Sequence, residues 1–174
     1  DSTADEVLDH IVDMVAHYFE VPIALVSIVS EHRQWFRAGT GLDERQTPRE
    51  ISFCAYSILG DDVFQVPDAE LDTRFKDNPL VVGEPRIRFY AGVPLVTADG
   101  LALGTLCIID NTPRPLLNPR DLAMLEMYGQ LVMKRLNNMR KASYVDQPTG
   151  LFNRLRLEED IMALADRDDH ALVA

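Results

Sequence analysis

Two apolar segments on either side of an Asp-Gly pair constrain the fold of this chain more than any other feature. Arg88–Val96 and Leu101–Ile109 are both rich in apolar residues, and Asp99-Gly100 lies between them. Asp-Gly pairs favour the tight turns that join antiparallel strands. The sequence therefore predicts a β-hairpin here. Because the second segment is apolar at successive positions, it predicts a central strand that is covered on both faces.

The remaining strand signals point to an antiparallel sheet. Ile23–Val29 and Gln34–Ala38 form a second expected hairpin, and Val63–Val66 a short strand. Pro94 indicates that its strand lies at an edge or carries a bulge at that point, because proline has no amide hydrogen to donate. The polar segment Asp43–Glu50 is predicted to be a surface loop.

Helices are expected at both ends of the sheet-forming region. A Thr3 cap starts the first helix and Pro22 stops it, Ser52 caps a short helix, and Asn118 caps a long helix that runs to about Ser143. Helices from the two ends would cover one face of the sheet, and the loop-rich middle would cover the other. The predicted fold class is therefore α+β, with room for a ligand pocket on the loop side.

Composition excludes several classes of function. The 174 residues carry a net charge of −11, which argues against binding to nucleic acid or to an anionic membrane. No apolar run reaches the ~20 residues that a membrane-spanning helix needs. Cys54 and Cys107 have no metal-ligand spacing, nor do the four histidines, so no metal site is predicted. A reduced, cytoplasmic protein is expected, in which the two cysteines do not form a disulfide.

Four strings of residues resemble a GAF domain of the kind attached to bacterial signalling enzymes. They are ISFCAYSIL, VFQVPDAELDTRFKDNPLV, RIRFYAGVPLVTADGLALGTLCIID and the closing helix, and the likeness covers about Asp5 to Lys141. The resemblance implies a central antiparallel sheet of five or six strands, with terminal helices on one face and a loop-rich pocket side on the other. Residues 1–142 are assigned to this sensor domain, including a C-terminal signalling helix.

A second resemblance begins near the end of the chain. The string DQPTGLFNR at Asp146–Arg154 resembles the opening of a diguanylate cyclase (GGDEF) domain, although Pro148 and Leu155 depart from the family's pattern. Residues 143–174 are accordingly interpreted as a junction and an incomplete start of that domain. The sequence stops before the family's metal-binding Asp, and a chain that starts at Asp1 without Met reads as a piece of a longer protein. The fragment itself is expected to be no enzyme and to form no cyclic di-GMP from GTP.

The resemblance places a candidate ligand site on the pocket side. The residues assigned to it are Phe53, Cys54, Phe64, Asp68, Arg74, Phe89 and Tyr90. Most of the aromatic residues, with Phe75 among them, are expected to be plain core, Cys54 to be a small buried residue, and Asp72 with Arg74 to brace a turn. An arginine that faced the pocket would favour an anionic ligand. The sequence names no ligand and no cofactor.

The last helix also carries a candidate interface. Val132, Leu136 and Met139 continue a 3–4 apolar spacing beyond the point where the sheet is expected to end. These residues, helped by Leu8 and Val15 of the first helix, are predicted to form a weak homodimer.

Three functions are compatible with these features. The main hypothesis is a regulatory small-molecule-binding GAF module that controls a downstream diguanylate cyclase. The second is a thiol enzyme resembling free methionine sulfoxide reductases, with Cys54 as the thiol, although Asp72–Asn78 lacks that family's other cysteine. The third is a structural dimerisation module. A bilin-binding GAF domain is disfavoured, because Cys54 is followed by Ala55 instead of histidine.

Overall fold

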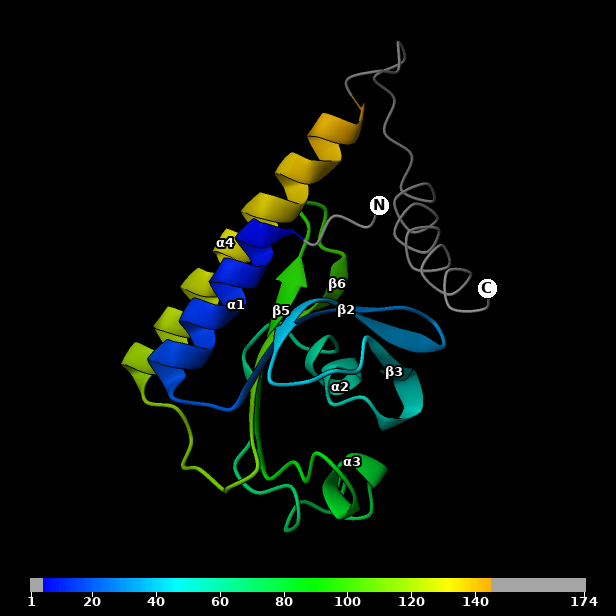
Figure 1. Ribbon diagram of the computed structural model, residues 1–174, viewed down its shortest axis with the longest axis vertical. Helices are drawn as coiled ribbons and strands as arrows, with labels where there is room; N and C mark the ends of the chain where they lie inside the picture. Colours follow the sequence, from blue (N-terminus) through cyan, green and yellow to red (C-terminus); the bar gives the residue numbers. More distant parts are fainter. Residues whose placement is uncertain (1–4, 145–174) are drawn as a thin grey trace. The chain divides into compact units, whose positions relative to one another are not determined.

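The computed structural model describes residues 5–144 of the chain (Figure 1). The elements, in chain order, are α1 (Glu6–Phe19), β1 (Ile23–Val29), β2 (Arg33–Thr40), β3 (Gln46–Pro48), a 3₁₀ turn (Arg49–Ile51), α2 (Cys54–Ser57), β4 (Phe64–Val66), α3 (Pro79–Val82), β5 (Phe89–Val96), β6 (Ala102–Asp110) and α4 (Pro119–Tyr144). Residues Ala4–Leu136 form one compact unit, and the last residues of α4 belong to a second. None of the described helices is long and apolar enough to cross a membrane.

The described strands form one six-stranded antiparallel sheet in the order β3-β2-β1-β6-β5-β4. β6 lies at its centre, as the apolar run of this strand predicts. The Asp-Gly hairpin is confirmed: Gly100 has φ +86°, which glycine adopts readily. In the same turn, the amide of Leu101 donates to the Thr97 hydroxyl at 3.0 Å. The predicted α+β class, with five or six strands, is confirmed.

Pro94 is tolerated because β5 changes from an interior to an edge strand along its length. β4 pairs with β5 at Tyr90–Gly92 and has ended before Pro94, whose remaining neighbour is Thr105 of β6. The register also shifts between Leu95 and Val96, which marks a bulge beside the proline. Both expectations for Pro94 therefore hold locally, although β5 is an interior strand elsewhere.

Two local predictions are wrong. Asp5 caps α1, where its carboxylate accepts from the amides of Val7 and Leu8 at 3.0 and 3.3 Å, whereas the expected cap, Thr3, lies outside the described residues. The segment predicted to be a surface loop contains β3 and the 3₁₀ turn. β3 pairs with β2 in an antiparallel ladder, and the Gln34 side-chain amide donates to the Thr47 hydroxyl at 2.8 Å. A polar edge strand has no apolar alternation that could reveal it.

Strand side chains alternate between two cores on opposite faces of the sheet. Leu106 and Ile108 of β6 point to the face that α1 and α4 cover, and Cys107 and Ile109 point to the other. Figure 1 shows α1 and α4 side by side on one side of the sheet, and α2 and α3 in the loop-rich region. The Tyr18 hydroxyl of α1 donates to Asp121 of α4 at 3.1 Å, which ties these two helices together.

Two of the three expected dimer residues of α4, Val132 and Leu136, are used inside the domain instead. Val132 is fully buried in the helix-side core and Leu136 packs against that core, so both side chains are covered within a single chain. Gly129 permits this close packing, because a Cβ there would lie 2.9 Å from Cγ1 of Val93. Leu8 and Val15 of α1 are also fully buried. The homodimer stays a prediction, but it cannot rest on these buried side chains.

Candidate functional site

A cavity lies on the sheet face opposite α1 and α4. It offers about 60 Å³ to the centres of water-sized molecules, which is room for a few waters or for a small ligand. Strands β1, β2, β3, β5 and β6, helices α2 and α3, and the loops that precede β3 and follow α3 enclose it. The lining residues are Ile23, Leu25, Gln34, Phe36, Leu42, Glu44, Thr47, Phe53, Cys54, Leu80, Glu84, Pro85, Ile87, Tyr90 and Ile109.

Three of the seven predicted site residues, Phe53, Cys54 and Tyr90, line this cavity. Phe89 does not line the cavity. It precedes Tyr90 on β5, and because adjacent strand residues face opposite sides of the sheet, its ring is fully buried in the helix-side core. Phe64 lies outside the lining, and the Arg74 guanidinium sits 5.1 Å from the centre of its ring. Direct ligand contact by any of the seven stays a prediction.

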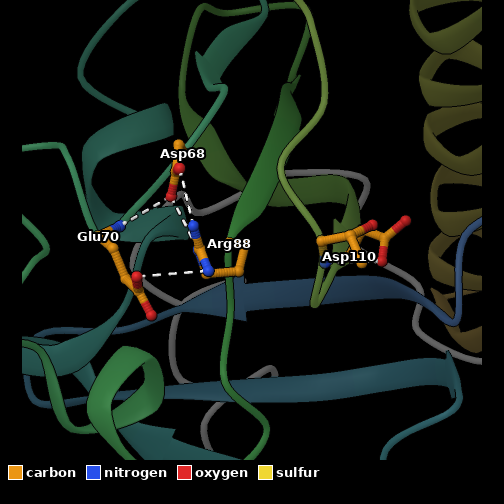
Figure 2. Close-up of polar contacts among 5 residues, drawn as sticks. Asp68, Glu70, Arg88 and Asp110 are labelled. Carbon is orange, nitrogen blue, oxygen red and sulfur yellow. Dashed lines mark hydrogen bonds and ion pairs between the residues drawn. The ribbon is translucent and has the colours of Figure 1, made fainter.

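Asp68 braces a loop and does not face the cavity. Its carboxylate accepts from Nε and Nη2 of Arg88 at 2.8 and 2.9 Å, and Glu70 lies 3.3 Å from Nη1 of the same residue (Figure 2). The hydrogen bond from Arg88 lowers the pKa of Asp68 below its ordinary value. The Arg88 amide also donates to the carbonyl of Asp110 at 2.9 Å. Arg88 therefore joins the segment after β4 to the end of β6.

Three described arginines in the loops around the cavity are held by carboxylates. Arg74 bonds to Asp72 as the sequence predicts, Arg88 to Asp68, and Nε of Arg86 lies 3.3 Å from Glu84. Among the lining residues no Arg or Lys occurs, and the charged ones, Glu44 and Glu84, are exposed acids. The cavity therefore disfavours an anionic ligand and suits a neutral or cationic one.

Most polar groups inside the cavity already have protein partners. The Gln34 side chain donates to Thr47 and accepts from the Ser52 hydroxyl at 2.6 Å, and Ser52 in turn accepts from the Ala55 amide at the start of α2. The Tyr90 hydroxyl donates to the sulfur of Cys54 at 3.3 Å. A ligand that entered would meet mainly apolar surface, because these groups would have to give up a bond to receive another. Sequence reasoning missed Gln34 and Thr47, whose pairing depends on the unpredicted strand β3.

An aromatic cluster continues from the cavity toward Arg74. The rings of Phe53 and Phe75 stack at 4.1 Å between centroids, and Phe53 lies 5.3 Å from Tyr90. Of the five aromatic residues expected to be mostly core, all but Phe64 are buried. This cluster packs against the start of α2, where Phe53 and Cys54 lie.

The two cysteines meet beneath the cavity, although 52 residues separate them in the sequence. Their sulfurs lie 3.9 Å apart, and both thiols are free and buried. Burial raises the pKa of Cys54, but hydrogen bonds from Cys107, Ser27, Thr105 and Tyr90 outweigh burial and lower it to about 6. The hydrogen bond to Cys54, together with burial, raises the pKa of Cys107 well above its ordinary value.

Comparison with known proteins assigns the family. The GAF domain family model matches residues 3–136. A cyclic di-GMP phosphodiesterase of Pseudomonas aeruginosa is 60% identical over 165 residues, which are 95% of this chain and 28% of that protein. The chain thus spans little more than a quarter of the length of that relative.

Solved structures of low identity share the fold. A domain of a putative two-component sensor histidine kinase from Sinorhizobium meliloti superposes with a TM-score of 0.66 at 18% identity, covering 84% of this chain and all of that one. The free methionine-R-sulfoxide reductase of Neisseria meningitidis, in complex with its substrate, gives 0.65 at 15% identity, covering 82% and 83%. The chain belongs to the GAF domain family, as its motifs predict.

Proposed function

We propose that this chain is the sensory module of a signalling protein that makes or degrades cyclic di-GMP, and that its cavity receives a small, largely apolar, neutral or cationic molecule. The observation that carries the proposal is the apolar cavity on one face of a sheet whose other face is closed by the two terminal helices. A binding site at this position can bias α2 and the surrounding loops without disturbing the main core.

Two features support the link to cyclic di-GMP. The string at Asp146–Arg154, outside the described residues, resembles the start of a GGDEF domain, which favours control of a downstream diguanylate cyclase. The Pseudomonas relative is named a cyclic di-GMP phosphodiesterase, which favours hydrolysis as a second possible output. Both outputs use one messenger, so an assay of the full-length protein must measure synthesis from GTP and hydrolysis of cyclic di-GMP together.

Leu42→Trp tests the cavity as the sensing site. Leu42 is half-buried and lines the cavity, so an indole there should fill the entrance with little effect on the core. The matched control is Leu59→Trp, because Leu59 is 77% exposed and does not line the cavity. A library of small metabolites is screened by thermal shift against all three forms of the chain. A binder stabilises the fold by RT ln(1 + [L]/Kd).

We expect at least one amine or neutral apolar compound to raise the melting temperature of the wild type and of Leu59→Trp but not of Leu42→Trp. In the full-length protein, the same compound should change cyclic di-GMP turnover in the first two forms only. A library without any binder, or a compound that shifts all three forms equally, would argue for a structural module instead.

We also propose a homodimer through the seam between α1 and α4. Val7, Met14 and Met127 are each 47% exposed and Leu131 is 42% exposed, which leaves apolar area on both helices. Tyr18 of α1 contacts Tyr128 of α4, with ring centroids 6.3 Å apart, so these residues lie on the faces by which the two helices meet. A second copy of this surface is the proposed partner.

Sedimentation at matched concentrations tests this dimer. Leu131→Asp should dissociate it without loss of stability, whereas Leu59→Asp should leave it intact. A wild type that stays monomeric at high concentration would refute the interface, and so would a dimer that is insensitive to Leu131→Asp.

A further inference from the structure

A pair of thiols is assembled from two elements that are distant in sequence. Cys54 begins α2 and Cys107 lies in the middle of β6, where its strand neighbours are Leu25 and Gly92. The sulfurs are 3.9 Å apart, within reach of an S–H···S hydrogen bond. A sulfur–sulfur bond of about 2.0 Å needs their further approach, and α2 is a short helix that can supply it.

The cavity gives a small solute a route to one of these sulfurs. Cys54 is among the lining residues, whereas Cys107 lies deeper and has no exposed surface. The space of about 60 Å³ admits small molecules, with hydrogen peroxide among them, and excludes a peptide disulfide such as oxidised glutathione. Access is therefore selective by size, and it needs no unfolding of the domain.

The surroundings divide the roles of the two thiols. The hydrogen bond with Cys107, followed by those of Ser27, Thr105 and Tyr90, stabilises negative charge on Cys54 and brings its pKa to about 6 despite burial. The pKa of Cys107 is raised by its bond to Cys54 and by burial. A thiolate is the nucleophile in such chemistry, and its protonated neighbour is placed to resolve the product.

We propose that Cys54 and Cys107 are an oxidisable dithiol that hydrogen peroxide, entering through the cavity, converts to an intramolecular disulfide. The Cys54 thiolate attacks one peroxide oxygen, the O–O bond breaks, and hydroxide leaves and takes up a proton to give water and a sulfenic acid on Cys54. Cys107 then loses its proton and attacks the Cys54 sulfur, so that the S–O bond breaks and a second water leaves. The two thiols lose two electrons in total, and peroxide gains them.

This modification would change the wall of the cavity. Sulfur–sulfur bonding draws the start of α2 toward β6 and removes the thiol that accepts from Tyr90. Since Phe53, the residue before Cys54, stacks on Phe75, the aromatic cluster should move with α2. The dithiol proposal does not depend on the proposed cyclic di-GMP output, so the two are tested separately.

The experiment treats the folded chain with hydrogen peroxide, removes the peroxide with catalase, and alkylates the remaining thiols in denaturant. Peptide mapping by mass spectrometry then identifies the bonds. We expect a Cys54–Cys107 disulfide in the wild type at peroxide doses that oxidise the half-exposed Met14, and none with oxidised glutathione. In Cys107→Ser, dimedone that is added together with the denaturant, after removal of the peroxide, should trap a sulfenic acid on Cys54, whereas Cys54→Ser should leave Cys107 unmodified.

Two free thiols in the wild type after treatment at that peroxide dose would overturn the proposal. This outcome is measured on the wild type alone, so it does not depend on whether the cysteine variants fold. Disulfides that form only between chains would overturn it as well. Equal reaction of dimedone with both single variants would contradict the division of roles between the sulfurs.

Discussion

The two faces of the sheet are built from the same strands, but one face is closed to small molecules and the other borders a cavity. Toward α1 and α4, residues such as Leu106, Val12 and Leu125 have no exposed surface and close the core. Toward the loops, Leu25 and Ile109 border a cavity, beside thiols and stacked aromatic rings. The helix side is therefore closed, whereas the loop side combines a buried core with a cavity.

Gly104 should give the largest effect, because it tests the central strand that both faces share. A Cβ at this position would lie 1.9 Å from the carbonyl oxygen of Ser27 in β1, and backbone cannot move aside as a side chain can. We expect Gly104→Val to cost on the order of 4 kcal/mol in the free energy of unfolding. Gly60→Val is the control, with nothing within 4 Å of its Cβ. Denaturant melts that show equal stability for both variants would refute the packing of β1 on β6.

A matched pair of leucines compares the faces directly. Leu106 is fully buried under the helices and Leu25, at 2% exposed, borders the cavity. Leu106→Ala should cost about 4 kcal/mol and Leu25→Ala about 2 kcal/mol, because a side chain beside existing space loses fewer contacts. Urea unfolding of the two variants measures the difference. If Leu25→Ala cost as much as Leu106→Ala, the loop side would be as closely packed as the helix side.

Asp5 gives a smaller, pH-dependent effect on the helix side. Burial raises its pKa, but the hydrogen bond from Arg135 and the amides of Leu8 and Val7 outweigh burial and keep it below the ordinary 3.8. A carboxylate with a depressed folded pKa stabilises the fold above the unfolded pKa, and this contribution is lost as the pH falls through the folded pKa.

Asp5→Asn keeps a residue that can cap the helix and removes the charge. It should cost about 1 kcal/mol at neutral pH, and the difference from the wild type should begin to shrink near about pH 4 and vanish below the folded pKa of Asp5. Melting curves from pH 7 to 2 measure this difference. A difference that stays constant over the whole range would mean that the cap alone, and not the ion pair with Arg135, stabilises the helix.

Local signals in the sequence were sufficient for much of the fold. The Asp-Gly hairpin is confirmed, and so is the Asn118 cap, whose side-chain oxygen accepts from the Asp121 amide at 2.9 Å. Both depend on residues close together in the chain. The edge strand β3 was missed because Gln46-Thr47-Pro48 has no apolar alternation, and the burial of Val132 was missed because the packing of α4 on the rest of the domain is a tertiary property.

The site was less accessible from the sequence than the fold. Phe53, Cys54 and Tyr90 were assigned to the pocket through family resemblance, and they do line the cavity. Phe89 was misplaced because adjacent residues of a strand face opposite sides, and its register was not known. Nothing in the spacing of Cys54 and Cys107 indicates that their sulfurs meet, since that contact requires the positions of α2 and β6 together.

The central claim is that the loop side of the sheet is open to small molecules and the helix side is closed. Xenon binds apolar cavities of this kind, so methyl NMR spectra of the Ile- and Leu-labelled chain under xenon pressure test the claim directly. We predict shifts for the methyl groups of Ile23, Leu25 and Ile109 and none for Leu106 and Ile108. Unchanged spectra, or equal shifts on both faces, would contradict the account.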